Sequence, residues 1–327
     1  MKFKSERDFI ASLRRRVHRR PRRLIAGIGD DAAVLNMRSG EEWCITTDLL
    51  VEGIHFDLHY DSAHSVGHKS LTAGLSDIAA MGARARFALV SIAVPSSKAE
   101  PFLSGFYRGF LPLARKCGVT LIGGDTSRSE RDCFVDVIVM GQSLQPSIRR
   151  SGARVGDLIF VTGTLGQAAW GLHLLRNSPL AKTRAEKSAI QAHLHPTAQT
   201  EAGLWLGKNR LASAMIDVSD GLSTDLHHLC RESGVGARVE ERKIPVAPMP
   251  SRKQALRYAL TGGEDYQLLF TVHPANLHRV RGRISKLGLS EIGRIVSREA
   301  GVLLISPGGR SKKLPISGWD HFREGIR

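Results

Sequence analysis

Six short acidic segments follow apolar runs along this chain of 327 residues, and they constrain its fold more than any other feature. Apolar runs of strand length that end in glycine and aspartate predict buried strands leading into turns. The sequence therefore predicts a sheet with carboxylates gathered at one end. The six segments are Gly27-Ile28-Gly29-Asp30-Asp31, Thr46-Thr47-Asp48, Leu75-Ser76-Asp77, Gly123-Gly124-Asp125, Asp217-Val218-Ser219-Asp220 and Gly262-Gly263-Glu264-Asp265.

The residue types in these turns suit a particular chemistry. Glycine lets the backbone approach an anion closely, while aspartate supplies oxygen ligands for a divalent cation such as Mg²⁺. A single turn of this kind is equally well explained by ordinary turn chemistry, in which Asp and Gly dominate. Six of them, in a chain with 47 Lys and Arg against 31 Asp and Glu, indicate one site where cations meet a phosphorylated ligand.

Apolar periodicity divides the chain into alternating strands and helices. In the first half it predicts strands at 24–28, 33–36, 43–47, 87–94, 119–122 and 134–142, and helices at 62–81 and 100–117. Beyond a turn-rich stretch at 145–157, it predicts strands at 158–162, 214–218, 267–272, 291–295 and 301–305, and helices at 167–177, 185–194, 199–208, 222–233 and 275–287. Alternation in both halves predicts an α/β fold with mixed sheets, in two domains at 1–147 and 148–327.

Composition places the chain among ordinary globular proteins and excludes several classes. Hydrophobic residues make up 42% and charged residues 24%, and no apolar stretch approaches the length of a membrane span. The cysteines are far apart and form no CxxC pair, which argues against a disulfide framework and a zinc site. We therefore expect a protein of the reducing cytoplasm with no membrane partner. The four cysteines are Cys44, Cys117, Cys133 and Cys230.

Half of the formal net charge of +16 lies in residues 1–23, which hold ten basic and two acidic side chains. Most of it belongs to the arginine-rich segment 14–23, for which a nucleic-acid contact, an organelle-targeting segment and a solvated helix end are alternatives. Apolar residues at helical spacing, Phe9, Leu13 and Val17, favour the helix end. We therefore expect no nucleic-acid partner.

The common nucleotide-binding motifs are missing from the sequence. It contains no GxxxxGK[ST] loop, no GxGxxG after a predicted strand and no HRD…DFG set. The run Gly67-His68-Lys69-Ser70 lacks the upstream glycine of a phosphate-binding loop and lies inside a predicted helix. A protein that used ATP would therefore need a less common fold.

Longer segments around the acidic turns resemble the thiamine-monophosphate kinase family, which shares a superfamily with aminoimidazole ribonucleotide synthetase and selenophosphate synthetase. The matching segments run from residue 27 to residue 322, and those around His55 and Glu264 are the most specific. They include Gly27–Ala33, Thr46–Phe56, Leu75–Gly82, Ile122–Thr126, Arg150–Ala153, Val161–Gly166, His195-Pro196, Ile216–Leu222, Leu260–Tyr266 and Gly318–Phe322.

The resemblance implies a two-domain architecture similar to aminoimidazole ribonucleotide synthetase and a homodimer formed through the N-terminal domains. It also assigns roles to individual residues. The implied Mg²⁺ ligands are Asp31, Thr46, Thr47, Asp48, Asp77, Asp125, Asp217 and Asp220, with Asp30 adjacent to them. The implied ATP contacts are Gly124, Asp125, Arg150 and Ser219, with Tyr107 a weaker match near the nucleotide. The implied thiamine-phosphate contacts are His55, Glu264 and Trp319.

The reaction that the resemblance implies is ATP-dependent phosphorylation of thiamine monophosphate to thiamine diphosphate. Its nucleophile is a phosphate oxygen that is already ionised at neutral pH, so we expect no catalytic base and direct in-line transfer assisted by several Mg²⁺ ions. Another ATP-dependent enzyme of the superfamily is the alternative. Selenophosphate synthetase would carry a reactive cysteine before Cys44, and aminoimidazole ribonucleotide synthetase would carry other residues in place of the His55 segment. A nucleic-acid-binding protein would leave the acidic turns unexplained.

Overall fold

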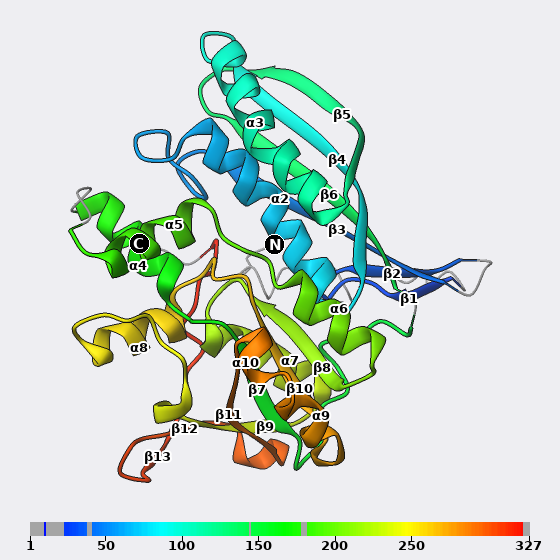
Figure 1. Ribbon diagram of the computed structural model, residues 1–327, viewed down its shortest axis with the longest axis vertical. Helices are drawn as coiled ribbons and strands as arrows, with labels where there is room; N and C mark the ends of the chain where they lie inside the picture. The colour runs from blue at the N-terminus through cyan, green and yellow to red at the C-terminus, as the bar shows by residue number, and fades with distance from the viewer. Residues whose placement is uncertain (1–9, 11–22, 38–40, 144, 178–181, 323–327) are drawn as a thin grey trace.

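The chain forms two sheets, one from each half of the sequence, with helices packed between and around them (Figure 1). The computed structural model describes residue 10 and residues 23–37, 41–143, 145–177 and 182–322. The predicted N-terminal helix and nearly all of the arginine-rich segment 14–23 lie outside these residues. None of the described helices is both long and apolar enough to cross a membrane.

The N-terminal sheet has six strands in the order β1-β2-β3-β6-β4-β5. The β4 and β5 strands are parallel and the other neighbours are antiparallel, so the sheet is mixed as predicted. Its strands are β1 (Leu24–Ala26), β2 (Ala33–Asn36), β3 (Glu42–Val51), β4 (Arg84–Pro95), β5 (Thr120–Ser129) and β6 (Phe134–Ser143).

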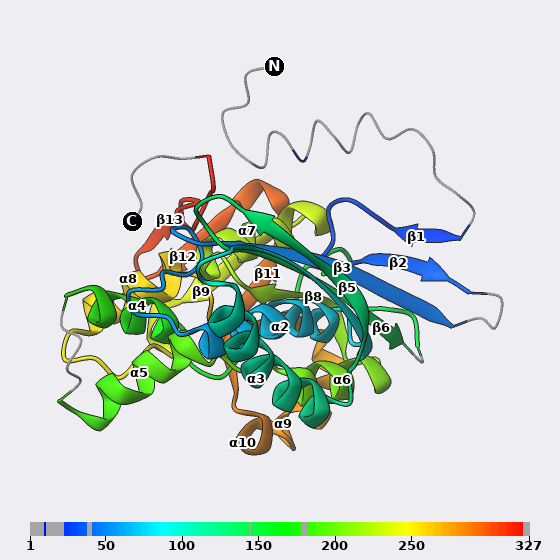
Figure 2. The same ribbon diagram turned by 90° about the horizontal axis from the view of Figure 1, so that it is seen from above.

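Helices α2 (Ala63–Ala80) and α3 (Ala99–Cys117) lie on the same side of this sheet (Figure 2). A capping box between Ser62 and Ser65 begins α2, and Gly118 at a φ of 70° ends α3. Small residues let α2 approach the sheet, since a Cβ on Gly74 would lie 2.5 Å from Val139 Cγ2. The opposite face of the sheet carries exposed side chains along β3 and β5.

The C-terminal sheet has seven strands in the order β13-β12-β9-β11-β7-β10-β8, and only β9 and β12 are parallel neighbours. Its strands are β7 (Leu158–Thr162), β8 (Ala212–Val218), β9 (Gly236–Glu240), β10 (Gln267–Val272), β11 (Leu289–Val296), β12 (Val302–Ile305) and β13 (Ser311–Lys313). The helices of this half are α4 (Gln167–Asn177), α5 (Arg184–Leu194), α6 (Thr200–Lys208), α7 (Leu222–Ser233), α8 (Arg252–Thr261), α9 (Leu277–Arg281) and α10 (Ile284–Leu287).

Helix α2 joins the two halves, because it contacts the N-terminal strands β3 and β6 on one side and β8 and β10 on the other. Its Ala79 and Ala80 belong to the same buried apolar cluster as Met215 and Phe270 of the C-terminal sheet. The helix also packs on α6 so closely that a Cβ on Gly203 would lie 2.2 Å from the Ala79 carbonyl oxygen. The end of α2 that carries Asp77 is therefore held between the two sheets.

Three of the six acidic segments predicted as turns lie within regular elements, and one of them, Leu75-Ser76-Asp77, lies inside the helix that is also predicted at 62–81. Asp48 lies within the ten-residue strand β3, Asp77 lies within α2, and Gly123-Gly124-Asp125 lies within β5. Hydrogen bonding along the sheet explains the strand residues, because β5 pairs with β4 through the two glycines and Asp125 as far as Ser129. The acidic groups are therefore held by rigid elements as well as by loops.

Two further predictions about the second half need correction. The predicted helix 275–287 is interrupted at Gly282 and Arg283, so that it forms the separate helices α9 and α10. Sequence periodicity also missed β9, α8 and β13, which are short elements of the C-terminal half. The other predicted strands and helices in the described part of the chain are present with ends that differ by a few residues, except the strand predicted at 119–122, which is β5 and continues to Ser129.

Candidate active site

Three carboxylates from three different elements converge between the two sheets. Asp31 follows β1, Asp77 lies near the end of α2, and Asp217 lies near the end of β8. Each offers an oxygen, and the three oxygens lie within 4.8 Å of one another. This carboxylate cluster therefore draws ligands from both halves of the chain, separated by up to 186 positions, as the distance from Asp31 to Asp217 shows.

Polar neighbours hold each carboxylate of the cluster in place. The Thr46 hydroxyl donates a hydrogen bond to Asp77, and the Ser76 hydroxyl donates to Asp217 Oδ2 at 2.7 Å. Arg150 Nη2 lies 2.8 Å from Asp31 Oδ1, and the backbone N–H of Arg150 donates to Asp30 Oδ1 at 3.1 Å. The predicted ATP contact Arg150 is therefore the cation that the protein itself places beside this cluster.

Asp48 extends the cluster along strand β3. Its Oδ2 is buried without a hydrogen-bond partner, and it lies against α2 where a Cβ on Gly74 would be 3.6 Å away. Asp31 Oδ2 is likewise buried and has no partner. Buried carboxylate oxygens without a donor are costly, and a hard divalent cation is the ligand that they suit best. The donor set therefore fits Mg²⁺.

Burial and mutual repulsion raise the pKa values of the carboxylates in and beside the cluster. Burial and then the charges of Asp48 and Asp217 raise the pKa of Asp77 well above its usual range, and burial with Asp31 does the same to the pKa of Asp217. Burial and Asp136 raise the pKa of Asp48 to about 7, and burial and Asp31 raise that of Asp30 to about 6. Crowded carboxylates of this kind favour either protons or a bound cation.

Two of the predicted metal ligands, Thr47 and Asp125, lie on the exposed face of the N-terminal sheet, opposite the face that carries Asp48. Side chains alternate along a strand, so Thr47 and Asp48 point to opposite sides of β3. Thr47 is exposed and donates to Asp136 Oδ1 at 2.7 Å. Asp125 is in register with Asp136 through Ser91, so it shares the exposed face. The single chain therefore does not bring Thr47 and Asp125 to the carboxylate cluster.

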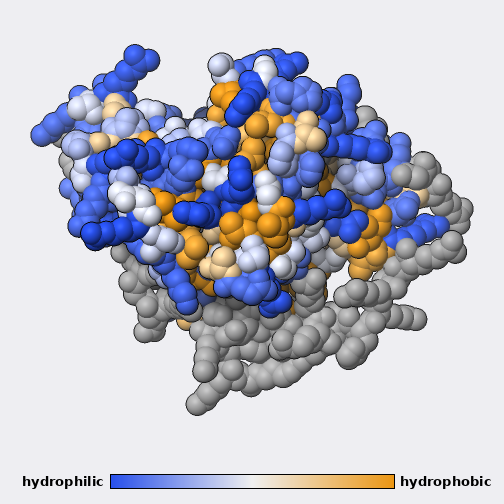
Figure 3. Space-filling model, turned by 90° about the horizontal axis from the view of Figure 1, so that it is seen from below, coloured by the Kyte–Doolittle hydropathy of each residue, from blue (hydrophilic) through white to orange (hydrophobic). Residues whose placement is uncertain are grey.

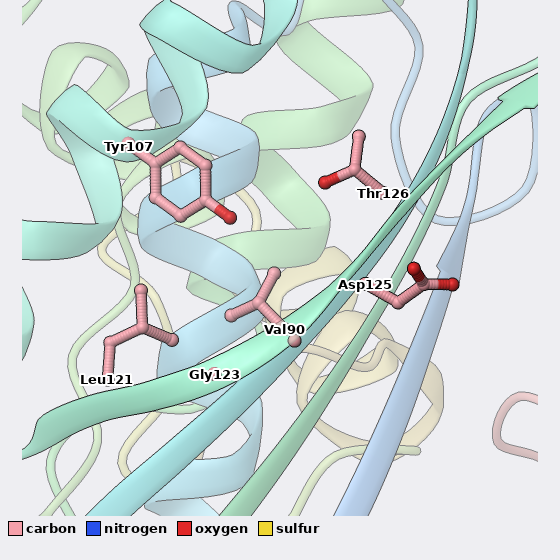
Figure 4. A pocket seen from close by; sticks show the side chains of 7 residues that line it. Val90, Tyr107, Leu121, Gly123, Asp125 and Thr126 are labelled. Carbon is pink, nitrogen blue, oxygen red and sulfur yellow. The ribbon is translucent and has the colours of Figure 1, made fainter.

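Gly124 and Asp125 instead line a cavity of about 380 Å³ beside α3. Tyr107 reaches from α3 towards β5 over this cavity, whereas the Asp125 carboxylate points away from the ring (Figure 4). Two of the predicted ATP contacts and the weaker match Tyr107 are thus neighbours. Arg150 does not line this cavity and lies at the carboxylate cluster.

A buried aspartate that sequence reasoning missed shapes the turn after β8. Asp225 Oδ2 accepts hydrogen bonds from the backbone N–H groups of Asp220 and Gly221, at 3.2 and 3.0 Å. Burial and the charge of Asp220 raise the pKa of Asp225 well above its usual range. The predicted ATP contact Ser219 lies in this turn, and the predicted metal ligand Asp220 is not one of the three carboxylates whose oxygens converge.

On the predicted thiamine side, Glu264 pairs with a buried lysine. Both of its carboxylate oxygens lie 3.2 Å from Lys69 Nζ, and His193 Nδ1 lies 3.3 Å from Oε2. Burial alone would raise the pKa of Glu264, but Lys69 and His193 outweigh it and lower that pKa to about 2. Sequence reasoning missed Lys69 and His193, although a lysine among the small and apolar residues of α2 is itself a signal of a buried partner.

The other two predicted thiamine contacts meet through a histidine. The His55 and His321 rings are 5.0 Å apart, and the Trp319 and His321 rings are 5.5 Å apart. Burial and the nearby His321 lower the pKa of His55 to about 4, so its ring is neutral at pH 7. The Lys69 ammonium also lies 3.4 Å from the His55 carbonyl oxygen, which brings His55 next to Glu264.

Backbone hydrogen bonds join the turn after β8 to the loops that carry the predicted thiamine contacts Glu264 and Trp319. Glu264 N–H donates to the Ser219 carbonyl at 2.8 Å, and Trp319 N–H donates to the Asp220 carbonyl at 3.1 Å. Glu264 and Tyr266 have φ angles of 65° and 49°, a conformation that non-glycine residues seldom adopt. Asp265 is structural, because it accepts from the backbone N–H groups of Gly166 and Ala168 where α4 begins.

Comparison with known proteins identifies the two halves. The family model described as AIR synthase related protein, N-terminal domain, matches residues 29–143, and that of the C-terminal domain matches residues 154–306. The thiamine-monophosphate kinase of Buchnera aphidicola subsp. Acyrthosiphon pisum is 35% identical over 98% of this chain and 100% of that protein. The thiamine-monophosphate kinase of Salmonella typhimurium is 38% identical over 90% of this chain and 91% of that protein.

Solved structures agree with these matches. The structure described as AaThiL complexed with AMPPCP and TMP has a TM-score of 0.85 and 32% identity, over 98% of this chain and 99% of that one. The thiamine-monophosphate kinase from Stenotrophomonas maltophilia K279a has a TM-score of 0.75 and 35% identity, over 91% and 94%. The hydrogenase maturation protein HypE in complex with ATP, at 18% identity, shares the fold alone.

The predicted family resemblance and the predicted two-domain α/β fold are therefore both confirmed. Matches above 30% identity extend over nearly the full length of both partners, and both domain models occur in order. This chain belongs to the thiamine-monophosphate kinase family, within the wider group of AIR synthase related proteins.

Proposed function

We propose that this thiamine-monophosphate kinase moves the γ-phosphoryl group of ATP directly onto the phosphate of thiamine monophosphate, in line and with the help of Mg²⁺. The observation that carries the proposal is the largely buried cluster of Asp31, Asp77 and Asp217, with unpartnered oxygens on Asp31 and Asp48. Such a cluster destabilises the empty protein, and its donor set suits cations that also bind phosphates.

The carboxylate cluster performs the electrostatic part of this chemistry. Asp31, Asp77 and Asp217 would hold Mg²⁺, with Thr46 and Asp48 beside them and Asp220 at the adjoining turn. Bound Mg²⁺ would offset the repulsion between the two polyanionic substrates. Arg150, 2.8 Å from Asp31, is placed to contact the phosphates as a second cationic group.

No side chain needs to remove a proton from the acceptor. A phosphate monoester has a second pKa of about 6, so its oxygen is already a nucleophile at neutral pH. Positioning and charge stabilisation then supply the rate, as in other phosphoryl transfers. We infer that the reaction has no phosphoenzyme, and a trapped phospho-aspartate would contradict this inference.

The second group of residues is suited to the thiamine end of the acceptor. Glu264 stays ionised down to low pH and is 27% exposed, so it can attract the cationic, amino-bearing thiamine. His55 presents a neutral ring, and Trp319 offers an aromatic surface on which a heterocycle can stack. Lys69 fixes Glu264, because it bonds both carboxylate oxygens.

We further propose that the protein is a cytoplasmic homodimer whose subunits meet through their N-terminal domains. The face of the N-terminal sheet opposite α2 and α3, which none of the described helices covers, carries Leu49 and Phe134, which are 55% and 37% exposed, and the edge strand β5 ends that sheet. Apolar side chains on an open face favour association. Thr47 and Asp125 lie on the same face, so a partner subunit is where these two predicted ligands would find the remainder of an ATP and metal site.

The proposed division of the chain at residues 147 and 148 follows the same organisation. The N-terminal sheet ends at Ser143 and the C-terminal sheet begins at Leu158. The four cysteines are free, which fits the reducing cytoplasm. The arginine-rich segment 14–23, on which a nucleic-acid function would rest, lies almost entirely outside the described residues.

Formation of thiamine diphosphate from ATP and thiamine monophosphate, measured by chromatography, tests the proposal. We expect activity that requires Mg²⁺ and that falls by at least about a hundredfold in Asp77→Asn. The matched control is Asp132→Asn, an exposed carboxylate away from the cluster, which should keep wild-type activity. Turnover that is independent of divalent cations, or an Asp77→Asn variant as active as wild type, would overturn the proposal.

A further inference from the structure

A second cavity lies in the C-terminal domain, apart from the carboxylate cluster. It has a volume of about 620 Å³ and lies between α8 and the hairpin of β12 and β13. Figure 3 views the molecule from below, the end where Figure 1 places β12 and β13, and apolar patches there are interrupted by hydrophilic side chains. A cavity of this size is suited to a small molecule, since ligand-binding pockets usually enclose roughly 300 to 1,000 Å³.

The floor of this groove is apolar. Leu304 and Leu314 are buried at its base, and Leu256 and Leu260 of α8 are partly buried beside them. These side chains belong to or pack against the main apolar cluster of the C-terminal sheet, so the floor is a rigid part of the domain. An apolar body of a ligand can therefore be desolvated here without rearranging the core.

All of the charged side chains that line the groove are cationic. Lys253, Arg257, Lys312 and Lys313 line it, and no acidic side chain is among the described lining residues. None of the four forms a salt bridge with any residue in the described part of the chain. Four cations around one apolar depression create a positive potential, and no counter-charge pairs with them among the described residues.

We propose that this groove is a second ligand site, which binds a soluble small molecule with an anionic head and an apolar body. The cationic rim accepts a phosphate, sulfonate or carboxylate, and the leucine floor accepts the apolar part. A recessed cavity suits a free molecule, whereas a membrane surface would need a protruding apolar face.

The groove is also connected to the residues proposed to hold thiamine monophosphate. One wall, α8, ends at Thr261, and the chain continues directly to Glu264. The other wall runs from Leu314 to Ser317 and continues directly to Trp319. A ligand bound between the two walls therefore affects the loops that carry Glu264 and Trp319, and we expect it to change the KM for thiamine monophosphate. This consequence rests on the proposed function, whereas the existence of the site does not.

The test uses anilinonaphthalene sulfonate, a fluorescent anion with an apolar body, and the full chain. We expect one saturable site per chain that persists at saturating ATP and thiamine monophosphate. The neutral analogue phenylnaphthylamine should bind at least about tenfold more weakly, because it lacks the anionic head. Complete displacement of the sulfonate at saturating ATP or thiamine monophosphate, or equal affinity for the neutral analogue, would overturn the proposal.

Charge reversal locates the binding. Lys312→Glu/Lys313→Glu should weaken the sulfonate about tenfold, as expected for two exposed charge contacts that become repulsive. Lys208→Glu/Lys286→Glu, which changes the net charge equally at exposed positions on α6 and α10, should change it by less than about twofold. If the first variant does not fold, the milder Lys253→Gln/Arg257→Gln pair replaces it. Equal effects of groove and control variants would show non-specific binding and refute the site.

The effect on substrate is measured separately, as the KM for thiamine monophosphate with and without the sulfonate. A changed KM that is lost in Lys312→Glu/Lys313→Glu supports the connection between the groove and the two loops. Saturable binding at the groove with an unchanged KM refutes that connection. A protein with no kinase activity but normal groove titrations would refute the proposed function and leave the groove site standing.

Discussion

The carboxylate cluster and the partly buried Glu264 have opposite electrostatic surroundings. The cluster of Asp31, Asp77 and Asp217 faces other carboxylates, and the pKa values of Asp77 and Asp217 are raised. Glu264 faces Lys69 and His193, and its pKa is lowered to about 2. Burial is common to both groups, so the neighbouring charges decide the protonation state.

The contrast separates two tasks at one site. Carboxylates that repel one another are stabilised by a bound cation, which suits a metal–phosphate site. A carboxylate already paired with lysine carries a fixed negative charge, which suits recognition of a cationic organic ring. Substitutions in the first group should therefore act on the chemical step, and those in the second on substrate affinity and on folding.

The largest expected effect is on turnover. Asp217→Asn should lower kcat about a thousandfold, because it removes a ligand from the centre that stabilises the transferring phosphoryl group. The matched substitution in the other group, Glu264→Gln, should mainly raise the KM for thiamine monophosphate. Steady-state kinetics of both variants provides the measurement. Equal effects on kcat would mean that the two groups do not have separate tasks.

The next effect is on stability. Lys69→Met should lower the free energy of unfolding by about 3 kcal/mol, because it leaves Glu264 beside an apolar side chain in place of its buried cation. Lys98→Met, which breaks the more exposed pair with Glu52, should cost less than about 1 kcal/mol. Urea unfolding compares the two variants. A smaller loss in Lys69→Met than in Lys98→Met would refute the buried pair.

A third effect is the pH dependence of stability without metal. The pKa of Asp48 is about 7 in the folded protein against an ordinary value of 3.8, so the folded state binds the extra proton between these values. Stability from this group is therefore fully present below pH 3.8 and is lost as pH rises to about 7, by at most about 1.4 kcal/mol per pH unit. Asp48→Asn should flatten that fall in urea titrations. An unchanged slope would show that Asp48 is not protonated in the empty protein.

Glu264 should show the reverse dependence over a lower range. Its folded pKa of about 2 lies below its ordinary value of 4.5, so its contribution is present above pH 4.5 and is lost as pH falls towards 2. Glu264→Gln should remove this acid-sensitive part. If the variant loses the same stability as pH falls from 4.5 towards 2, other carboxylates are responsible for that loss.

The smallest effect is expected at the aromatic edge of the thiamine side. His321→Asn removes the ring between His55 and Trp319 and should raise the KM for thiamine monophosphate by a few-fold, with kcat nearly unchanged. The KM for ATP is the internal control and should not change. A larger effect on ATP than on thiamine monophosphate would place His321 on the other side of the site.

Sequence patterns predicted most elements and singled out the acidic segments, and the family resemblance implied which of their residues bind metal. They identified Asp31, Asp77 and Asp217 without showing that a strand end, a helix and a loop bring them together. The alternation of side chains along β3 also separates Thr47 from Asp48, and that consequence required knowing that the strand continues to Val51.

Lys69 shows why the remainder could not be predicted. It lies inside α2, where the sequence indicates a helix that packs on a sheet, and its partner Glu264 is 195 positions away. Local propensity carries no information about such a pair, because the contact depends on how the two domains pack. The same holds for Asp225, whose acceptor role depends on the conformation of the turn at Asp220 and Gly221.

The central claim is that the carboxylate cluster, and not the Glu264 group, binds divalent cations. Electron paramagnetic resonance of Mn²⁺ added to the full chain without nucleotide measures this directly. We predict bound Mn²⁺ in wild type and in Glu264→Gln, and its loss in Asp77→Asn and Asp217→Asn. Retention of Mn²⁺ in both aspartate variants, or its loss in Glu264→Gln alone, would contradict the account.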